Sequence, residues 1–391
     1  MTTTTTPQTG WHQDLGSGAA GTALAHVAQA RASNLLPRAT RSWVKAMTAS
    51  PVTANASASL FYGAPAIAFV LHTGAHPAYA SMLARLDTAI NEITALKLAA
   101  AYERMARGEL TRPSEYDLIS GLTGLGLYHL IRHGSAATGM TSAVLEYLIA
   151  LAEPIYQYGE SLPGWWSGTG PSDTPDPEWP AGHLNLGMAH GISGVLALLS
   201  GAMRRGIQIA GQEKAVNELC MVFDRYRHGN GEVPWWPPMI SFNKYKHGTT
   251  DHDSQARPSW CYGTPGHARA QQLAGLALND RERIRVAECA LAGCVLDRRV
   301  TDLLTDASLC HGWAGVVQTL FRAHRDALDP QPLQAALRRA QRGLEDQLAR
   351  TGPPPASGLL EGTSGILLAQ NDLPANGSEP PPWDACLLLA L

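Results

Sequence analysis

The segment Gly191-Ile-Ser-Gly-Val-Leu-Ala-Leu-Leu-Ser200 contains two glycines three residues apart, followed by a run that is apolar on nearly every side. A helix of this kind is buried on several sides. Five other segments have the same Gly-x-x-small start before an apolar run, and internal repeats of this length indicate one repeated structural unit. They are Gly63-Ala-Pro-Ala66, Gly121-Leu-Thr-Gly124, Gly263-Thr-Pro-Gly266, Gly312-Trp-Ala-Gly315 and Gly362-Thr-Ser-Gly365.

Each interval between these segments has room for two helices and two loops. Residues Leu333 to Leu348 and Leu83 to Met105 have the alternating apolar and charged faces of amphipathic helices that cover a core. Runs with the period of two that is typical of strands are scarce. Buried inner helices that alternate with amphipathic outer helices predict an all-α fold, the closed (α/α)6 toroid, or barrel, of helical hairpins.

Two intervals contain stretches that do not have a helical pattern. Residues 162–186 and 229–259 are rich in Pro, Gly and Trp, and loops this long are commonly functional. We expect irregular insertions that fold over the barrel, in which short strands can form, and which can line a peptide groove. The predicted organisation is a disordered N-terminal tail over 1–20 and one barrel domain over 21–391.

Composition excludes several classes of partner. The net charge is only −3, with 16% charged and 45% hydrophobic residues, so that neither a nucleic-acid partner nor binding to an anionic membrane is indicated. No apolar run is long enough to span a bilayer, so no direct membrane insertion is expected. The N-terminal threonine tract lacks the features of a signal peptide, and a cytoplasmic enzyme is therefore expected.

Several reactive side chains share the same place in the repeat. Cys261 and Cys310 each lie two residues before a repeat glycine, and His190 and His311 lie directly before one. Asp117 and Arg257 lie a few residues before Gly121 and Gly263. In a closed toroid the loops before the inner helices meet at one end. Residues far apart in sequence are therefore predicted to meet at one mouth of the barrel.

Cys261, Cys310 and His311 form a suitable ligand set for one zinc ion per chain, with a fourth position open for water or substrate. Two thiolates cancel the formal charge of the metal, which suits activation of a substrate thiol better than activation of water. His190 and Asp117 can alternatively be helix caps, and Arg257 can pair with a neighbouring acid. Cys220, Cys289, Cys294 and Cys386 lie in apolar stretches and are interpreted as core residues rather than disulfide partners.

Three segments resemble the signature segments of the lanthionine synthetase C family. They are His190-Gly-Ile-Ser-Gly194, Ser259-Trp-Cys-Tyr-Gly-Thr-Pro-Gly266 and Leu309-Cys-His-Gly-Trp-Ala-Gly315. The resemblance extends over essentially the whole chain. It implies a stand-alone class I lanthipeptide cyclase, which adds peptide cysteine thiolates to dehydroalanine or dehydrobutyrine and forms (methyl)lanthionine thioether rings.

The resemblance also implies roles for the individual residues. Cys261, Cys310 and His311 would be the zinc ligands, and His190 would protonate the enolate that the addition produces. Asp117 would orient His190 or help to deprotonate the thiol, and Arg257 would stabilise the enolate oxygen or pair with Asp117. Tyr262, beside a ligand, is a further candidate. The implied partners are a dehydrated precursor peptide, a lanthipeptide dehydratase and an exporter.

Other functions remain open from the sequence. The same fold and metal would suit an enzyme that adds glutathione or another free thiol to dehydrated residues. A helical scaffold could bind peptides and keep zinc only for structure. An unrelated (α/α)6 glycosidase would need paired carboxylates at the mouth, where only Asp117 is evident. A prenyltransferase can use zinc to activate a thiol, but its repeat motifs differ.

Overall fold

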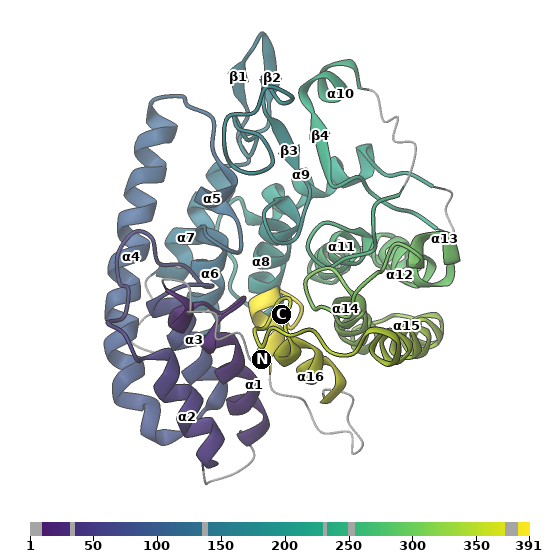
Figure 1. The fold of residues 1–391 in the computed structure, drawn as a ribbon. Coiled ribbons are helices and arrows are strands. Elements are labelled where there is room, and N and C mark those ends of the chain that lie inside the picture. Colours follow the sequence, from purple (N-terminus) through teal and green to yellow (C-terminus); the bar gives the residue numbers. More distant parts are fainter. Residues whose placement is uncertain (1–9, 32–35, 135–139, 230–232, 249–254, 372–381) are drawn as a thin grey trace.

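Seven helices form a closed inner ring in the part of the chain that the structure describes (Figure 1). This computed structural model describes residues 10–31, 36–134, 140–229, 233–248, 255–371 and 382–391. In ring order, with the last packing against the first, the inner helices are α1 (Ala19–Ala30), α3 (Ala64–Gly74), α6 (Leu122–Ile131), α8 (Ile192–Arg204), α11 (Thr264–Leu278), α14 (Trp313–Arg325) and α16 (Thr363–Asn371).

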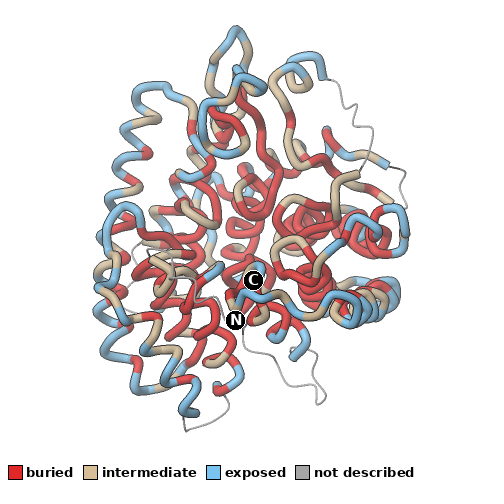
Figure 2. The backbone as a smooth tube through the Cα atoms, viewed as in Figure 1, coloured by how far each residue is buried: buried red, intermediate tan, exposed pale blue. Residues whose placement is uncertain are grey.

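Outer helices cover the ring, and burial is concentrated on their inward sides (Figure 2). Leu333, Leu337, Ala340 and Leu344 form the buried stripe of the last outer helix, as its sequence pattern predicts. The outer helices are α2 (Arg38–Met47), α4 (Ala80–Ala106), α7 (Met140–Ala150), α9 (Gln212–Arg225), α12 (Arg281–Leu296) and α15 (Pro330–Thr351).

The helical toroid is confirmed, but its first repeat was missed in the sequence. Gly18-Ala-Ala-Gly21 begins the inner helix α1, and Leu15 before it is fully buried. The disordered tail predicted over 1–20 was therefore wrong for residues 10–20, which also contain η1 (Trp11–Gln13), while residues 1–9 lie outside the described residues. Six complete hairpins result, from α1/α2 to α14/α15, and α16 closes the ring without an outer helix among the described residues.

The second glycine of the repeat is required by a close backbone contact. A Cβ atom at Gly315 would lie 2.1 Å from the carbonyl oxygen of Leu309, and one at Gly266 would lie 2.1 Å from that of Trp260. Real Cβ atoms do not approach an oxygen so closely. Glycine therefore lets the first turn of an inner helix pack against the loop that precedes it.

Backbone hydrogen bonds join these pre-helix loops to one another. Cys261 accepts a bond from Met188 (2.8 Å) and donates one to Cys310 (3.3 Å), whose own N–H reaches Leu360 (2.9 Å). Leu360 donates in turn to Gly16 (2.8 Å). Similar bonds connect Leu118 to Ala189 and Leu15 to Phe61. The bonds join residues two or three positions before the repeat glycines, so the loops that line the mouth are aligned with one another.

The two predicted insertions pair with each other. Strand β3 (His183–Asn185) lies antiparallel to β4 (Met239–Ser241), with Leu184 opposite Ile240. A separate hairpin consists of β1 (Ile155–Gln157) and β2 (Glu160–Leu162). Trp166 and Trp236 anchor the insertions in the interior. The remaining short helices are η2 (Pro77–Tyr79), α5 (Pro113–Tyr116), α10 (Phe242–His247) and α13 (Arg298–Thr301).

The C-terminal segment fills the centre of the ring (Figure 1). It contains η3 (Trp383–Leu387), in which Asp384 is fully buried and accepts a 2.6 Å bond from Nε of Arg322 on α14. The indole of Trp260 donates to Leu387 (3.0 Å). Among the described residues, no helix is long and apolar enough to cross a membrane.

The substitution Gly315→Ala is expected to lower the free energy of unfolding by about 3 kcal/mol, because the new methyl group overlaps the Leu309 carbonyl. The α3 hairpin has Ala66 at the same repeat position, so Ala66→Gly should cost only about 1 kcal/mol. Chemical denaturation followed by circular dichroism measures both values. A Gly315→Ala variant as stable as the wild type would contradict this account of the repeat.

Candidate metal centre

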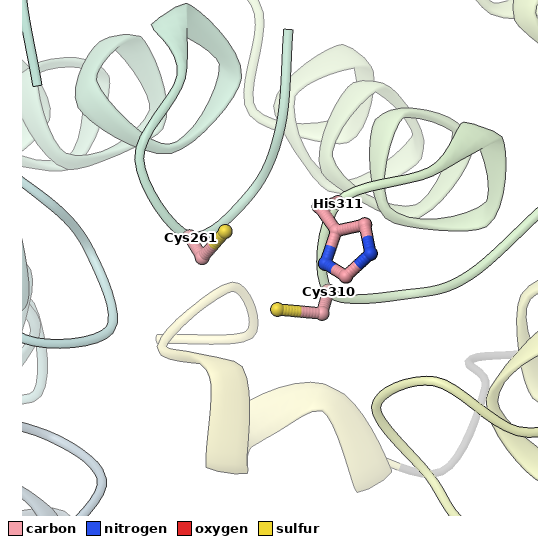
Figure 3. Close-up of side chains that lie close together, drawn as sticks. All are labelled: Cys261, Cys310 and His311. Atoms are coloured by element: carbon pink, nitrogen blue, oxygen red, sulfur yellow. The ribbon is translucent and has the colours of Figure 1, made fainter. Parts of the chain in front are cut away.

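Cys261, Cys310 and His311 meet at the mouth of the barrel (Figure 3). One donor atom from each lies within 4.8 Å of the other two. Cys261 is buried, whereas Cys310 and His311 are half-buried. The backbone bond between Cys261 and Cys310 keeps the two loops in register, so that two cysteines at the same repeat position face each other. The predicted ligand set is therefore brought together.

The orientation of His311 is set by neighbouring side chains. Its Nε2 lies 3.5 Å from Oδ2 of Asp306, and its backbone N–H donates to Oγ of Ser308 (3.3 Å). This leaves Nδ1 for a metal, and Figure 3 shows one ring nitrogen on the side of the sulfurs. A carboxylate that holds the distal nitrogen of a ligating histidine is a recurrent feature of metal sites.

The electrostatics of the two sulfurs match a bound cation. The hydrogen bond from Cys310 lowers the pKa of Cys261, with a further contribution from Ser259, although burial opposes it. The bond to Cys261, together with burial, raises the pKa of Cys310. The opposite shifts arise from the proximity of the two sulfurs, because two adjacent thiolates would repel each other. A thiophilic divalent cation would stabilise both anions, and zinc fits this donor set.

Asp117 and His190, from neighbouring loops of the mouth, form a hydrogen-bonded pair. His190 Nδ1 lies 2.6 Å from Oδ2 of Asp117, and the other oxygen of Asp117 accepts backbone N–H bonds from Ser120 (2.6 Å) and Gly121 (2.8 Å). Asp117 therefore holds the loop before α6 through one oxygen and binds His190 through the other, and its side chain does not cap α6, whose N-cap is Gly121. With Nδ1 engaged, Nε2 of the half-exposed His190 is available to a substrate.

The Asp117 carboxylate changes the pKa of His190. Burial lowers the pKa of His190, but the hydrogen bond and the charge of Asp117 raise it by more, and the net pKa lies above the ordinary value. Tyr262 stacks on the imidazole, with ring centroids 6.1 Å apart and planes at 24°. Burial raises the pKa of Tyr262 to about 12, so this residue stays a neutral phenol at physiological pH.

Arg257 lies on the metal-ligand side of the mouth. Its Nη1 is 3.9 Å from Oδ2 of Asp306, in agreement with the interpretation that it pairs with a neighbouring acid. The structure records no pairing of Arg257 with Asp117. Asp306, which contacts both Arg257 and His311, was missed in the sequence. It lies six residues before Gly312, as Arg257 does before Gly263, so the repeat register contains the signal that identifies it.

The other cysteines are free, and none forms a disulfide. Cys220, Cys294 and Cys386 are buried, as predicted, whereas Cys289 is only half-buried on α12. Burial raises the pKa of Cys220 and of Cys294 to about 12. Cys220, Cys294 and Cys386 are therefore core residues, the prediction was wrong for Cys289, and none of the four belongs to the donor set at the mouth.

The imidazole of His190 is expected to stay protonated to a higher pH than an ordinary histidine. The substitution Asp117→Asn removes the negative charge that raises the pKa of His190, while the burial that lowers this pKa remains. The pKa of His190 should therefore fall by about 1–2 units. Titration of the histidine side chains by NMR measures this shift. His183, whose pKa is lowered mainly by burial in β3, serves as an internal reference that should not change. Identical His190 curves in both proteins would refute the assignment.

Comparison with known proteins places this site in a family. A solved structure of nisin cyclase has a TM-score of 0.79 and 20% identity, and the superposition covers 97% of this chain and 93% of that one, which shows a common fold. Nisin biosynthesis protein NisC from Lactococcus lactis subsp. lactis is 24% identical over 265 residues. That alignment covers 66% of this chain and spans only 60% of the relative.

The family described as "Lanthionine synthetase C-like protein" matches residues 10–388. This range includes every pre-helix loop at the mouth, from Leu15 to Glu361, together with the residues that form the metal centre. The chain therefore belongs to the lanthionine synthetase C-like family.

Proposed function

We propose that this protein is a zinc-dependent lanthipeptide cyclase. The observation that carries the proposal is the meeting of two cysteines and a histidine with the Asp117–His190 pair at one mouth of the toroid. The two cysteines and the histidine suit activation of a thiol nucleophile, and the Asp117–His190 pair suits proton transfer. The reaction would be an intramolecular Michael addition of a peptide cysteine to dehydroalanine or dehydrobutyrine.

Cys261, Cys310 and His311 would hold one zinc ion per chain. Bound there, zinc would stabilise the substrate cysteine as a thiolate that stays nucleophilic, because two protein thiolates already offset the charge of the metal. Asp306 keeps His311 in its ligating orientation, and Arg257 keeps Asp306 in place. We therefore assign Arg257 to the support of the ligands; a direct effect on the enolate oxygen would need it to leave this ion pair.

His190 is the proposed proton donor. A new bond forms between the substrate sulfur and the β-carbon of the dehydrated residue, and the electron pair of the double bond moves to the adjacent carbonyl as an enolate. Nε2 of His190 then protonates the α-carbon. The thiol has released one proton and the α-carbon has gained one, so the product has the same mass as the substrate. Asp117 stabilises the charged imidazole through Nδ1, and Tyr262 holds the ring plane by stacking.

This chemistry requires a substrate that is already dehydrated. A dehydratase that acts on Ser and Thr of a precursor peptide must therefore precede this enzyme, and it is the partner we propose first. An exporter of the finished peptide and a cytoplasmic location belong to the same proposal. The pairing of β3 with β4 beside the His190 loop offers a wall against which an extended peptide can lie.

Purified protein is expected to bind about one zinc per chain, and Cys261→Ala to lose it while remaining folded. Metal analysis by mass spectrometry, with circular dichroism on the same samples, measures both properties. Cys289→Ala is the matched control, because Cys289 is on α12, outside the donor set. Wild-type protein without zinc would refute the mechanism. An unfolded Cys261→Ala protein would instead support a scaffold with structural zinc.

A synthetic peptide with one cysteine and one dehydroalanine is expected to lose its free thiol without a change of mass when the enzyme is added. His190→Asn should slow this reaction by about 10²–10⁴-fold while zinc is retained. Glutathione in the same assay tests the alternative enzyme that adds free thiols. Cyclic product in the presence of glutathione supports the cyclase, whereas linear glutathione adducts would overturn it.

A further inference from the structure

A groove of about 600 Å³ lies between α13, the first turn of α14 and the C-terminal half of α15. Its charged lining residues are four arginines and two aspartates. They are Arg298, Arg339, Arg342, Arg350, Asp302 and Asp346. We call this feature the arginine groove. Its excess of positive charge contrasts with the net charge of −3 of the whole chain.

The arginine groove is continuous with the metal centre. A second hollow of about 400 Å³ is lined by His311, Asp306 and Glu361, and it shares the lining residues Thr305, Gln347 and Thr351 with the groove. A ligand that extends along the groove therefore reaches a metal-ligating histidine.

Trp313, a buried residue, forms part of the base of the groove. Trp313, which follows the metal-ligand loop, lines the groove and packs against α15. A Cβ atom at Gly343 would lie 2.5 Å from its ring, so the glycine lets the indole approach the helix backbone. Three of the four arginines extend along residues 339–350 of α15, and this length suits an extended peptide better than a small inorganic anion.

The cations of the groove are available to a ligand. Among the described residues, none of the four arginines forms an ion pair with a carboxylate. Arg339 donates to the carbonyl of Val295 (2.6 Å) and Arg350 to the side chain of Gln347. Arg298 and Arg342 are exposed, and within the described residues their guanidinium groups have no recorded hydrogen bond. Guanidinium groups bind carboxylates through paired hydrogen bonds.

We propose that the arginine groove binds an acidic segment of the same peptide whose cysteine reaches the metal centre. This inference rests on the proposed function and names the part of the substrate that is held away from the reacting atoms. Carboxylates of the segment would pair with the exposed Arg298 and Arg342. Anchoring the chain beside the mouth raises the local concentration of the reacting cysteine.

The test measures binding without turnover, so that it does not depend on the chemistry. Two fluorescent peptides share one sequence without cysteine or dehydrated residues and differ only in an attached segment of Asp and Glu, or of Asn and Gln. Fluorescence anisotropy is expected to show that the wild type binds the acidic peptide about tenfold more tightly. Added salt should reduce this preference.

Arg298→Gln/Arg342→Gln is expected to abolish the preference and leave the affinity for the neutral peptide unchanged. Arg41→Gln/Arg338→Gln has the same change of charge at exposed positions outside the groove, on α2 and α15, and should keep the wild-type preference. The single variant Arg342→Gln, with an expected loss of about threefold, provides a second measurement if the double variant is unstable.

Equal affinity of the wild type for both peptides would overturn the proposal, as would a full preference in the groove variants. Failure of the cyclase proposal has a different signature. In that case the acidic peptide would bind through the arginine groove, but the dehydrated peptide would keep its free thiol in the cyclisation assay.

Discussion

The backbone hydrogen bonds between pre-helix loops are the constraint on which the rest of the structure depends. They tie neighbouring loops to one another at most junctions around the mouth, and the repeat glycines let the inner helices start directly behind their loops. A side chain at a given repeat position therefore lies at a defined place at the mouth of the barrel. Cys261 and Cys310 occupy the same position in adjacent repeats, which brings their sulfurs together.

The same constraint explains how one residue can serve both structure and chemistry. Asp117 accepts backbone bonds from Ser120 and Gly121 of its own loop through one oxygen and binds His190 of the next loop through the other. Because these loop bonds hold the buried carboxylate in place, its charge acts strongly on the imidazole. The conformation of the loop before α6 and the orientation of the proposed proton donor are therefore coupled, and a change at Asp117 affects both.

The interior of the ring is stabilised by the C-terminal segment. Asp384 is buried with Arg322, and Trp260, which directly precedes Cys261, donates a hydrogen bond to the carbonyl of Leu387. A buried ion pair is costly unless its partners are held in good geometry, and here α14 and η3 hold them. The C-terminal segment thus supports the loop that carries Cys261.

Much of the fold and of the site was predictable from the sequence, because glycine spacing and helical periodicity are local signals. They identified the inner helices from α3 to α16, the amphipathic helices α4 and α15, and the shared position of Cys261, Cys310, His311 and His190. The α1 repeat was missed because Gly18-Ala-Ala-Gly21 follows a stretch rich in Thr and Gly that resembles a flexible tail. Only the tertiary structure decided the number of inner helices, the pairing of β3 with β4 and the partner of Arg257. These depend on ring closure and on contacts between distant segments, which no local pattern specifies.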